Sequence, residues 1–110
     1  MRKIMYINSK QVESLAGEQF YLDYYILEEE MQISESISIM TYGVEITKRS
    51  GELVESKTVH AIMLDKHAIV NFVALLADNT VTPATLNDVV MDYVESGTWI
   101  SSSISDPIFY

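Results

Sequence analysis

Three carboxylates in the segment VTPATLNDVVMDYVES have the spacing of one helix face. Asp88, Asp92 and Glu95 follow one another at intervals of four and three residues. A helix turns by about 100° per residue, so these three side chains would lie within about 60° of one another. Such a stripe could bind a divalent metal, contact a basic partner or simply face water.

The apolar residues of the same segment argue against a metal site. On a helix they lie about 100° to 200° from Asp88, and they are Leu86, Val89, Val90 and Tyr93. A metal site needs ligands that converge from several elements into a partly enclosed space. We therefore interpret the stripe first as a solvated face, with a basic protein partner as the functional alternative. Residues 65–110 favour that alternative, because they hold six acidic residues and a single basic one, Lys66.

The two histidines, His60 and His67, are the other side chains that could do chemistry. Their spacing does not bring them together with a carboxylate, and the motifs H-E-x-x-H and H-x-x-x-H are absent. The sequence has no cysteine, and its four glycines form no phosphate-binding loop. We predict no catalytic, cofactor-binding or metal site. The alternative is a small-ligand or metal-dependent enzyme that uses a histidine with nearby carboxylates.

Seven tyrosines are the strongest oddity of the composition. Tyr21, Tyr24 and Tyr25 fall in one expected strand, so both faces of that strand carry aromatic rings. One face should contact the helices. The other, with Tyr21 and Tyr25, is expected either to stabilise the sheet by cross-strand packing or to contact another protein. The candidate interaction surface therefore comprises Tyr21, Tyr25, Asp88, Asp92 and Glu95.

Charge and length limit the classes of partner. Seven Lys and Arg face sixteen Asp and Glu, for a formal charge of −9, which disfavours nucleic acids and anionic membranes. No apolar run approaches the ~20 residues of a membrane span, and the N-terminus lacks a signal-peptide core. These features predict a cytoplasmic protein of one domain. The leading hypothesis is a small non-enzymatic protein-interaction or regulatory module, with a homodimer as one form of it.

The elements that carry these residues change character halfway along the chain. The segments EQFYLDYYILEEE, SESISIMTYGVEITKRS and LVESKTVHAIML alternate as strands, and KIMYIN predicts a fourth, short strand. Their turns are too short for a crossover helix, which favours an antiparallel meander. The triplet Glu28-Glu29-Glu30 is expected at the solvated end of its strand. The apolar parity switches near Ile39-Met40, with Gly43 nearby, which predicts a bulge or a strand apolar on both faces.

The second half predicts two helices. Asp65 is the expected N-cap of a helix over residues 66–79, whose apolar stripe is Ile69, Phe72, Val73 and Leu76. Thr82-Pro83 should begin the second helix and Gly97 should end it. We therefore expect an α+β fold in which a three- or four-stranded antiparallel meander carries a C-terminal two-helix hairpin on one face. Residues 1–97 should form this domain, followed by a Ser-rich, aromatic tail, residues 98–110.

Short motifs give the chain a family resemblance. The segments YGVEITKRSG, VES and NTVTPATLNDVVMDYVE resemble a family of small bacterial proteins of unassigned function, found chiefly in anaerobic Gram-positive bacteria. The resemblance covers the chain from about Phe20 to Glu95. It implies a strand with Tyr42-Gly43-Val44-Glu45 and a helical hairpin joined through Thr82-Pro83, but it implies no activity and no catalytic residues.

Overall fold

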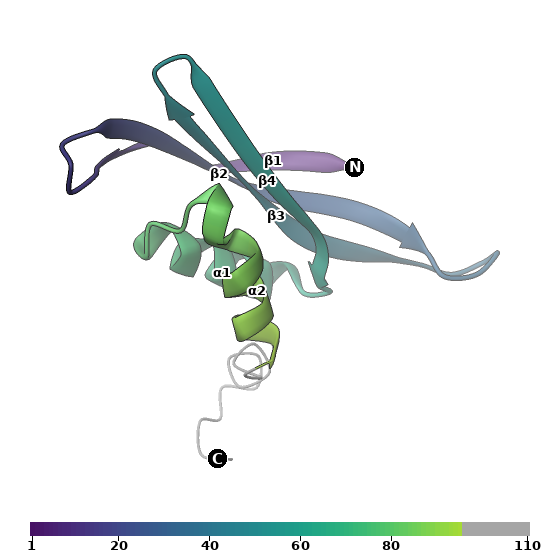
Figure 1. The fold of residues 1–110 in the computed structure, drawn as a ribbon. Coiled ribbons are helices and arrows are strands. Elements are labelled where there is room, and N and C mark those ends of the chain that lie inside the picture. The colour runs from purple at the N-terminus through teal and green to yellow at the C-terminus, as the bar shows by residue number, and fades with distance from the viewer. Residues whose placement is uncertain (96–110) are drawn as a thin grey trace.

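A four-stranded antiparallel sheet forms the first two-thirds of the molecule (Figure 1). The structure is a computed structural model and describes residues 1–95. The strands follow one another in the sheet order β1-β2-β3-β4, which confirms the predicted meander with four strands. Two helices follow, the second entered through a 3₁₀ turn, η1. The elements are β1 Arg2–Glu13, β2 Gln19–Gln32, β3 Ser38–Ser50, β4 Leu53–Met63, α1 Lys66–Asp78, η1 Pro83–Thr85 and α2 Leu86–Glu95. The predicted end of the second helix at Gly97 and the predicted tail lie outside the described residues.

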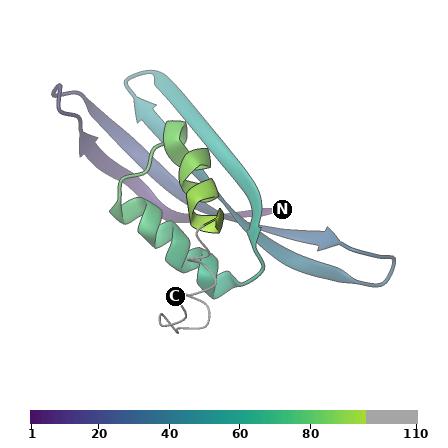
Figure 2. The same cartoon turned by 60° about the horizontal axis from the view of Figure 1, so that its bottom comes forward.

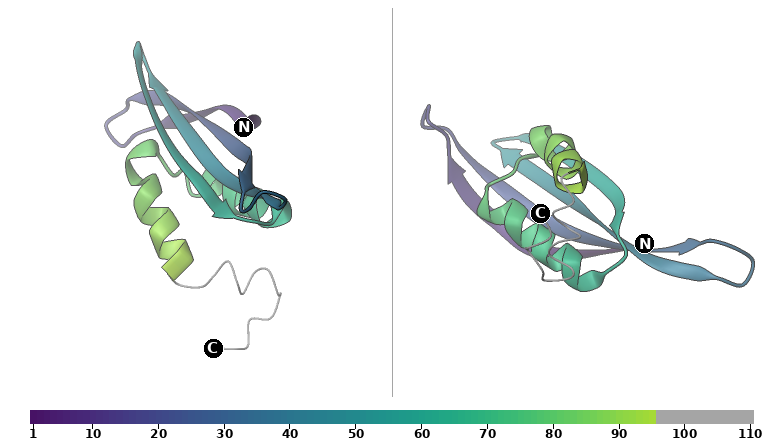
Figure 3. Two further views of the ribbon diagram at one scale, coloured as in Figure 1. Left: turned by 90° about the vertical axis from the view of Figure 1, so that its right-hand side faces the viewer. Right: turned by 90° about the horizontal axis from the view of Figure 1, so that it is seen from below.

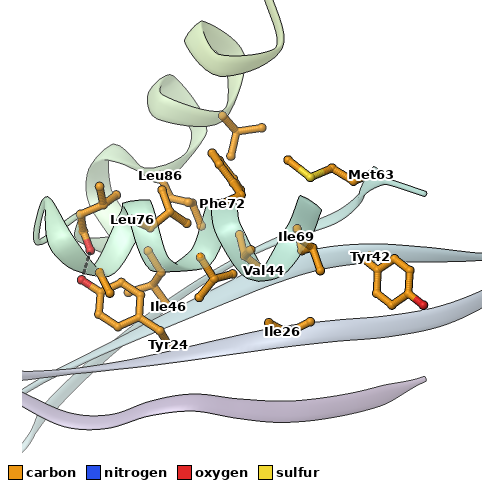
Figure 4. Packing of buried hydrophobic residues seen from close by; sticks show 14 of the residues in the cluster. Tyr24, Ile26, Tyr42, Val44, Ile46, Met63, Ile69, Phe72, Leu76 and Leu86 are labelled. Atoms are coloured by element: carbon orange, nitrogen blue, oxygen red, sulfur yellow. Dashed lines mark hydrogen bonds between the residues drawn. The ribbon is translucent and has the colours of Figure 1, made fainter. Parts of the chain in front are cut away.

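The core lies between one face of the sheet and α1 (Figures 2 and 4). Side chains at alternate positions of β2 and β3 point to this face, as the period of two in their sequences predicts. They meet the apolar stripe of α1, whose predicted members are all fully or almost fully buried. The buried set from these three elements is Leu22, Tyr24, Ile26, Tyr42, Val44, Ile46, Ile69, Phe72, Val73, Leu76 and Ala77.

The second helix packs on the first. The rings of Phe72 and Tyr93 lie with their centroids 4.4 Å apart, and Leu86 and Val90 are buried. The predicted core residues Val89 and Tyr93 are only half-buried, because α2 runs along the outside of the molecule.

The first helix begins where the sequence predicts, whereas at the predicted start of the second the chain forms a 3₁₀ turn and α2 itself begins at Leu86. The Asp65 carboxylate accepts the backbone N–H of His67 at 3.1 Å and so caps α1. Pro83 begins the 3₁₀ turn η1, and the backbone N–H of Thr85 donates to the carbonyl of Thr82 at 3.2 Å. The Thr82 hydroxyl caps no backbone N–H group.

Gly43 marks the place where β4 leaves its regular pairing. The register between β3 and β4 shifts between Tyr42 and Val44, whose partners are Met63 and Val59. A Cβ atom on Gly43 would lie 2.2 Å from the carbonyl oxygen of Val59, so only glycine permits this approach of the two backbones. The predicted bulge near Gly43 is present, and its extra residues belong to β4.

Beyond this bulge, β2 and β3 continue as a two-stranded hairpin that we call the arm (residues 29–41). The last partner of β1 on β2 is Glu28, and the last partner of β4 on β3 is Tyr42. The right-hand view of Figure 3 shows the arm projecting past the helices. The acidic triplet is therefore not the end of its strand, because Glu29 and Glu30 pair with Thr41 and Met40 inside the arm.

Candidate interaction surfaces

The predicted carboxylate stripe lies on the outer face of α2. Asp88, Asp92 and Glu95 are all exposed, and within residues 1–95 no basic side chain pairs with them. Met91, which is 55% exposed, lies on the same helix about 60° from Asp88. Lys66 lies on the other helix, with its Nζ atom 3.9 Å from the Glu28 carboxylate. This face of α2 is therefore acidic with an apolar margin.

The two predicted tyrosines lie on the sheet face that is turned away from α1, which we call the open face. Tyr25 carries the Lys3 ammonium 4.6 Å from its ring centroid, and Tyr21 carries the Arg49 guanidinium at 5.4 Å. Each cation comes from a neighbouring strand, so both rings take part in cross-strand contacts. A protein contact at this face stays a prediction.

The five predicted surface residues do not form one surface. The tyrosines lie on the open face, whereas α2 and its carboxylates lie on the helical side of the sheet (Figure 2). The structure therefore divides the predicted surface into two separate ones.

A buried charged residue that sequence reasoning missed lies beside Tyr21. The Asp23 carboxylate accepts the backbone N–H of Ser9 at 2.6 Å and the Nε–H of Arg49 at 3.1 Å. The Arg49 Nη2 atom also donates to the Ser9 hydroxyl at 2.6 Å. Burial raises the pKa of Asp23, but the bonds from Arg49 and Ser9 outweigh burial and hold this pKa below its ordinary value of 3.8.

No local signal could have found this cluster, because its members come from three strands and depend on the register between them. Ser9 also has a φ of +58°, at an irregularity of β1. The cluster ties β1, β2 and β3 together, and each of its charged groups already has a partner inside it. Its arrangement is that of a structural ion pair.

The two histidines do not meet. His60 lies near Glu29 on the open face, with its Nδ1 atom 3.5 Å from the carboxylate, and both side chains are about half exposed. His67 lies at the start of α1, on the other side of the sheet. In the described part of the chain, no group of three His, Asp or Glu side chains is placed to hold a metal ion. The structure thus brings one of the two predicted histidines, His60, close to one carboxylate, Glu29.

Comparison with known proteins identifies a family and no function. Residues 3–96 match a family of unknown function (DUF6514), a longer span than the segment that carried the resemblance. No curated protein and no solved structure matches the chain. Within residues 1–95, neither helix has the length and apolar character needed to cross a bilayer.

Proposed function

Because the chain belongs to this family of unknown function, we propose a role from its own surface: a small protein-interaction module that binds a basic partner through α2. The observation that carries the proposal is the outer face of this helix. Asp88, Asp92 and Glu95 face solvent there, no basic side chain of residues 1–95 pairs with them, and the exposed Met91 offers an apolar side chain beside them. Such a surface is complementary to a partner that presents Lys or Arg side chains around an apolar side chain, because the charges are opposite and the apolar groups can be buried together.

The charge of the whole chain supports the same partner. At −9, the molecule attracts basic surfaces and repels acidic ones before contact, and residues 65–95 concentrate this effect on the helical side. A cytoplasmic location, a regulatory role and an origin in anaerobic Gram-positive bacteria accompany the proposal as predictions from the sequence.

A charge-matched comparison tests the proposal. One variant neutralises the α2 face (Asp88→Asn, Asp92→Asn, Glu95→Gln). The control neutralises three exposed carboxylates away from α2, at the end of β1 and in the turns between strands (Glu13→Gln, Glu18→Gln, Glu52→Gln). The probe is a lysine-rich peptide with a central leucine, titrated by fluorescence anisotropy. We expect the α2 variant to bind at least about tenfold more weakly and the control to bind within about twofold of the unmodified protein.

The two variants lose the same charge, so general attraction to a polycation would weaken both equally. An equal loss in both variants, or no loss in either, would contradict a binding site on α2. Raising the salt concentration should also weaken the binding of the peptide to the α2 face, because salt screens the attraction between exposed charges.

A further inference from the structure

The free strand edges of the sheet are protected unequally. Native sheets prevent unwanted pairing at their edges with charged side chains and bulges. The β1 edge has two register irregularities and three basic residues, and the β4 edge carries Glu55 and Lys57. In the arm, the β2 edge carries Glu29 and Glu30.

The β3 edge of the arm has none of these devices. Ile37 and the first four residues of β3 read Ile-Ser-Ile-Met-Thr, with no charge and no proline, and the pairing with β2 is regular from Ser38 onward. β4 pairs with β3 only from Tyr42 onward, so this stretch has no strand on its outer side within residues 1–95. Among the edges that the structure describes, this one is open to another strand.

The backbone of this edge is oriented for pairing. The N–H of Ile33 donates to the carbonyl of Ile37 at 2.9 Å, and the register places Ile39 opposite Met31. Residues 37 and 39 therefore bond toward β2. Because bonding alternates along an antiparallel strand, Ser38 and Met40 turn their N–H and C=O groups outward.

The side chains beside this edge are apolar. Met31, Ile33, Ile37 and Ile39 fall on one face of the arm, since they are cross-strand partners or two residues apart. Three of them are strongly exposed: Ile33 is 59% exposed, Ile37 is 55% exposed and Met31 is 43% exposed. A strand added at the β3 edge would extend this apolar face.

We propose that the strand added there is the same segment of a second copy of this chain. Two antiparallel β3 edges related by a two-fold axis at Ile39 would place Ser38 of each copy opposite Met40 of the other. Their outward N–H and C=O groups would then form hydrogen bonds in both directions, as a self-complementary interface requires. The two arms would form one four-stranded sheet whose apolar face combines the side chains of both copies.

The net charge of the chain makes this uncharged edge a more favourable contact between two copies than the acidic parts of the surface. Two copies that each carry −9 repel, and this repulsion is least where neither contributes a charge to the contact. The arm projects past the helices, which keeps the acidic faces of the two α2 helices apart (Figure 3). At 0.10–0.15 M salt, exposed charges that lie more than about 8–10 Å apart are largely screened from one another, which weakens the remaining repulsion between the two copies.

Two proline variants at one cross-strand pair test the proposal. Glu30 and Met40 are partners in the arm; both are exposed, and each turns its N–H to an outer edge, Glu30 at the β2 edge and Met40 at the β3 edge. Proline at either position leaves the bonds between β2 and β3 intact. By sedimentation equilibrium, we expect the unmodified chain to reach twice its 12.5 kDa. Met40→Pro should raise the dimer dissociation constant at least about tenfold, and Glu30→Pro should not raise it.

A single cysteine gives a second, independent measurement. The chain contains no cysteine, so Ile39→Cys introduces one thiol per copy, placed at the proposed two-fold axis. We expect mild oxidation to cross-link this variant into a dimer, because the two Cβ atoms would come within disulfide reach. Lys57→Cys at the β4 edge is the matched control and should stay monomeric under the same oxidation.

Several results would overturn the proposal. A strict monomer up to millimolar concentration would do so, and would leave the edge to a strand of another protein. A dimer that Met40→Pro leaves unchanged would place the contact elsewhere, for example on the open face with Tyr21 and Tyr25. Because the arm and α2 are separate surfaces, each of these results leaves the proposed binding of a basic partner standing.

Discussion

Gly43 shows how one side-chain position can decide the path of two strands. Its missing Cβ lets the backbone of β4 approach at Val59, and β4 then leaves β3 toward the helices. The sequence indicated a bulge near this glycine, because the apolar parity of the segment changes before it. The strand that carries the extra residues could not be predicted, since a bulge depends on the register of both partners.

Replacing Gly43 by alanine should destabilise the domain. The added Cβ would overlap with backbone atoms of β4, which cannot move aside as a flexible side chain can. We expect the free energy of unfolding in urea to fall by about 2–3 kcal/mol. Gly51→Ala is the control: Gly51 has a φ of +60° but open space around its Cβ position, so it should lose only about 1 kcal/mol. A Gly43→Ala protein as stable as the unmodified one would contradict the close approach.

At the scale of elements, the hydrophobic periodicity and the capping residues of the sequence correctly predicted the type of three strands and of α1. The alternation of β2, β3 and β4 and the 3.6-residue stripe of α1 gave the correct type of element, and Asp65 gave the start of α1. The strand β1 is longer than predicted, because irregularities between Met5 and Lys10 interrupt its alternation. The division of the candidate surface between two sides of the sheet could not be predicted, since it requires knowing which face the helices cover.

A buried hydroxyl joins two of these elements. The Tyr24 phenol of β2 donates to the carbonyl of Val81, in the link between α1 and η1, at 2.8 Å. Tyr24→Phe leaves this buried carbonyl without its partner and should lower the free energy of unfolding by about 1–2 kcal/mol. Tyr25→Phe, on the open face, should change it by less than about 0.5 kcal/mol and serves as the control.

The same tyrosine should give the domain a response to alkali. Burial raises the pKa of Tyr24 to about 12 from an ordinary value of 10.0. In the unfolded chain the phenol loses its proton first, so the stabilisation that is complete below pH 10 should decline as the pH rises toward 12. Chemical denaturation across this range should show a steeper decline for the unmodified protein than for Tyr24→Phe. Equal slopes would mean that the phenol is not buried in solution.

At the scale of the whole molecule, the domain consists of a packed part and a projection. The buried cluster takes its side chains from both helices, from the link between them, from β2 up to Ile26, from β3 beginning at Tyr42 and from Met63 of β4. None of its members comes from the arm. The molecule is flat and somewhat elongated, with extents of 50 × 38 × 19 Å. The arm was not predicted as a separate feature, because its sequence alternates like the rest of β2 and β3.

Removing the arm should leave the packed part folded. Glu29 and Thr41 are cross-strand partners that bond to each other, so replacing residues 30–40 by Asn-Gly should close the hairpin with a two-residue turn. We expect circular dichroism to show the same helical signal, with a melting temperature within about 5 °C of the unmodified protein. Loss of the cooperative transition would show that the arm contributes to the core.

The end of α1 is held by the other end of the chain. The Lys10 ammonium of β1 donates to the carbonyl of Ala77 and, at 3.2 Å, to the Thr80 hydroxyl, across 67 and 70 positions of sequence. Contacts this distant raise the contact order and slow folding, since the intervening chain must be closed into a loop first. On the ribosome, β1 must therefore wait for its helical partner until the chain past Thr80 has left the exit tunnel. Until then, the helices do not yet pack on the newly synthesised sheet, and its apolar face is accessible to chaperones.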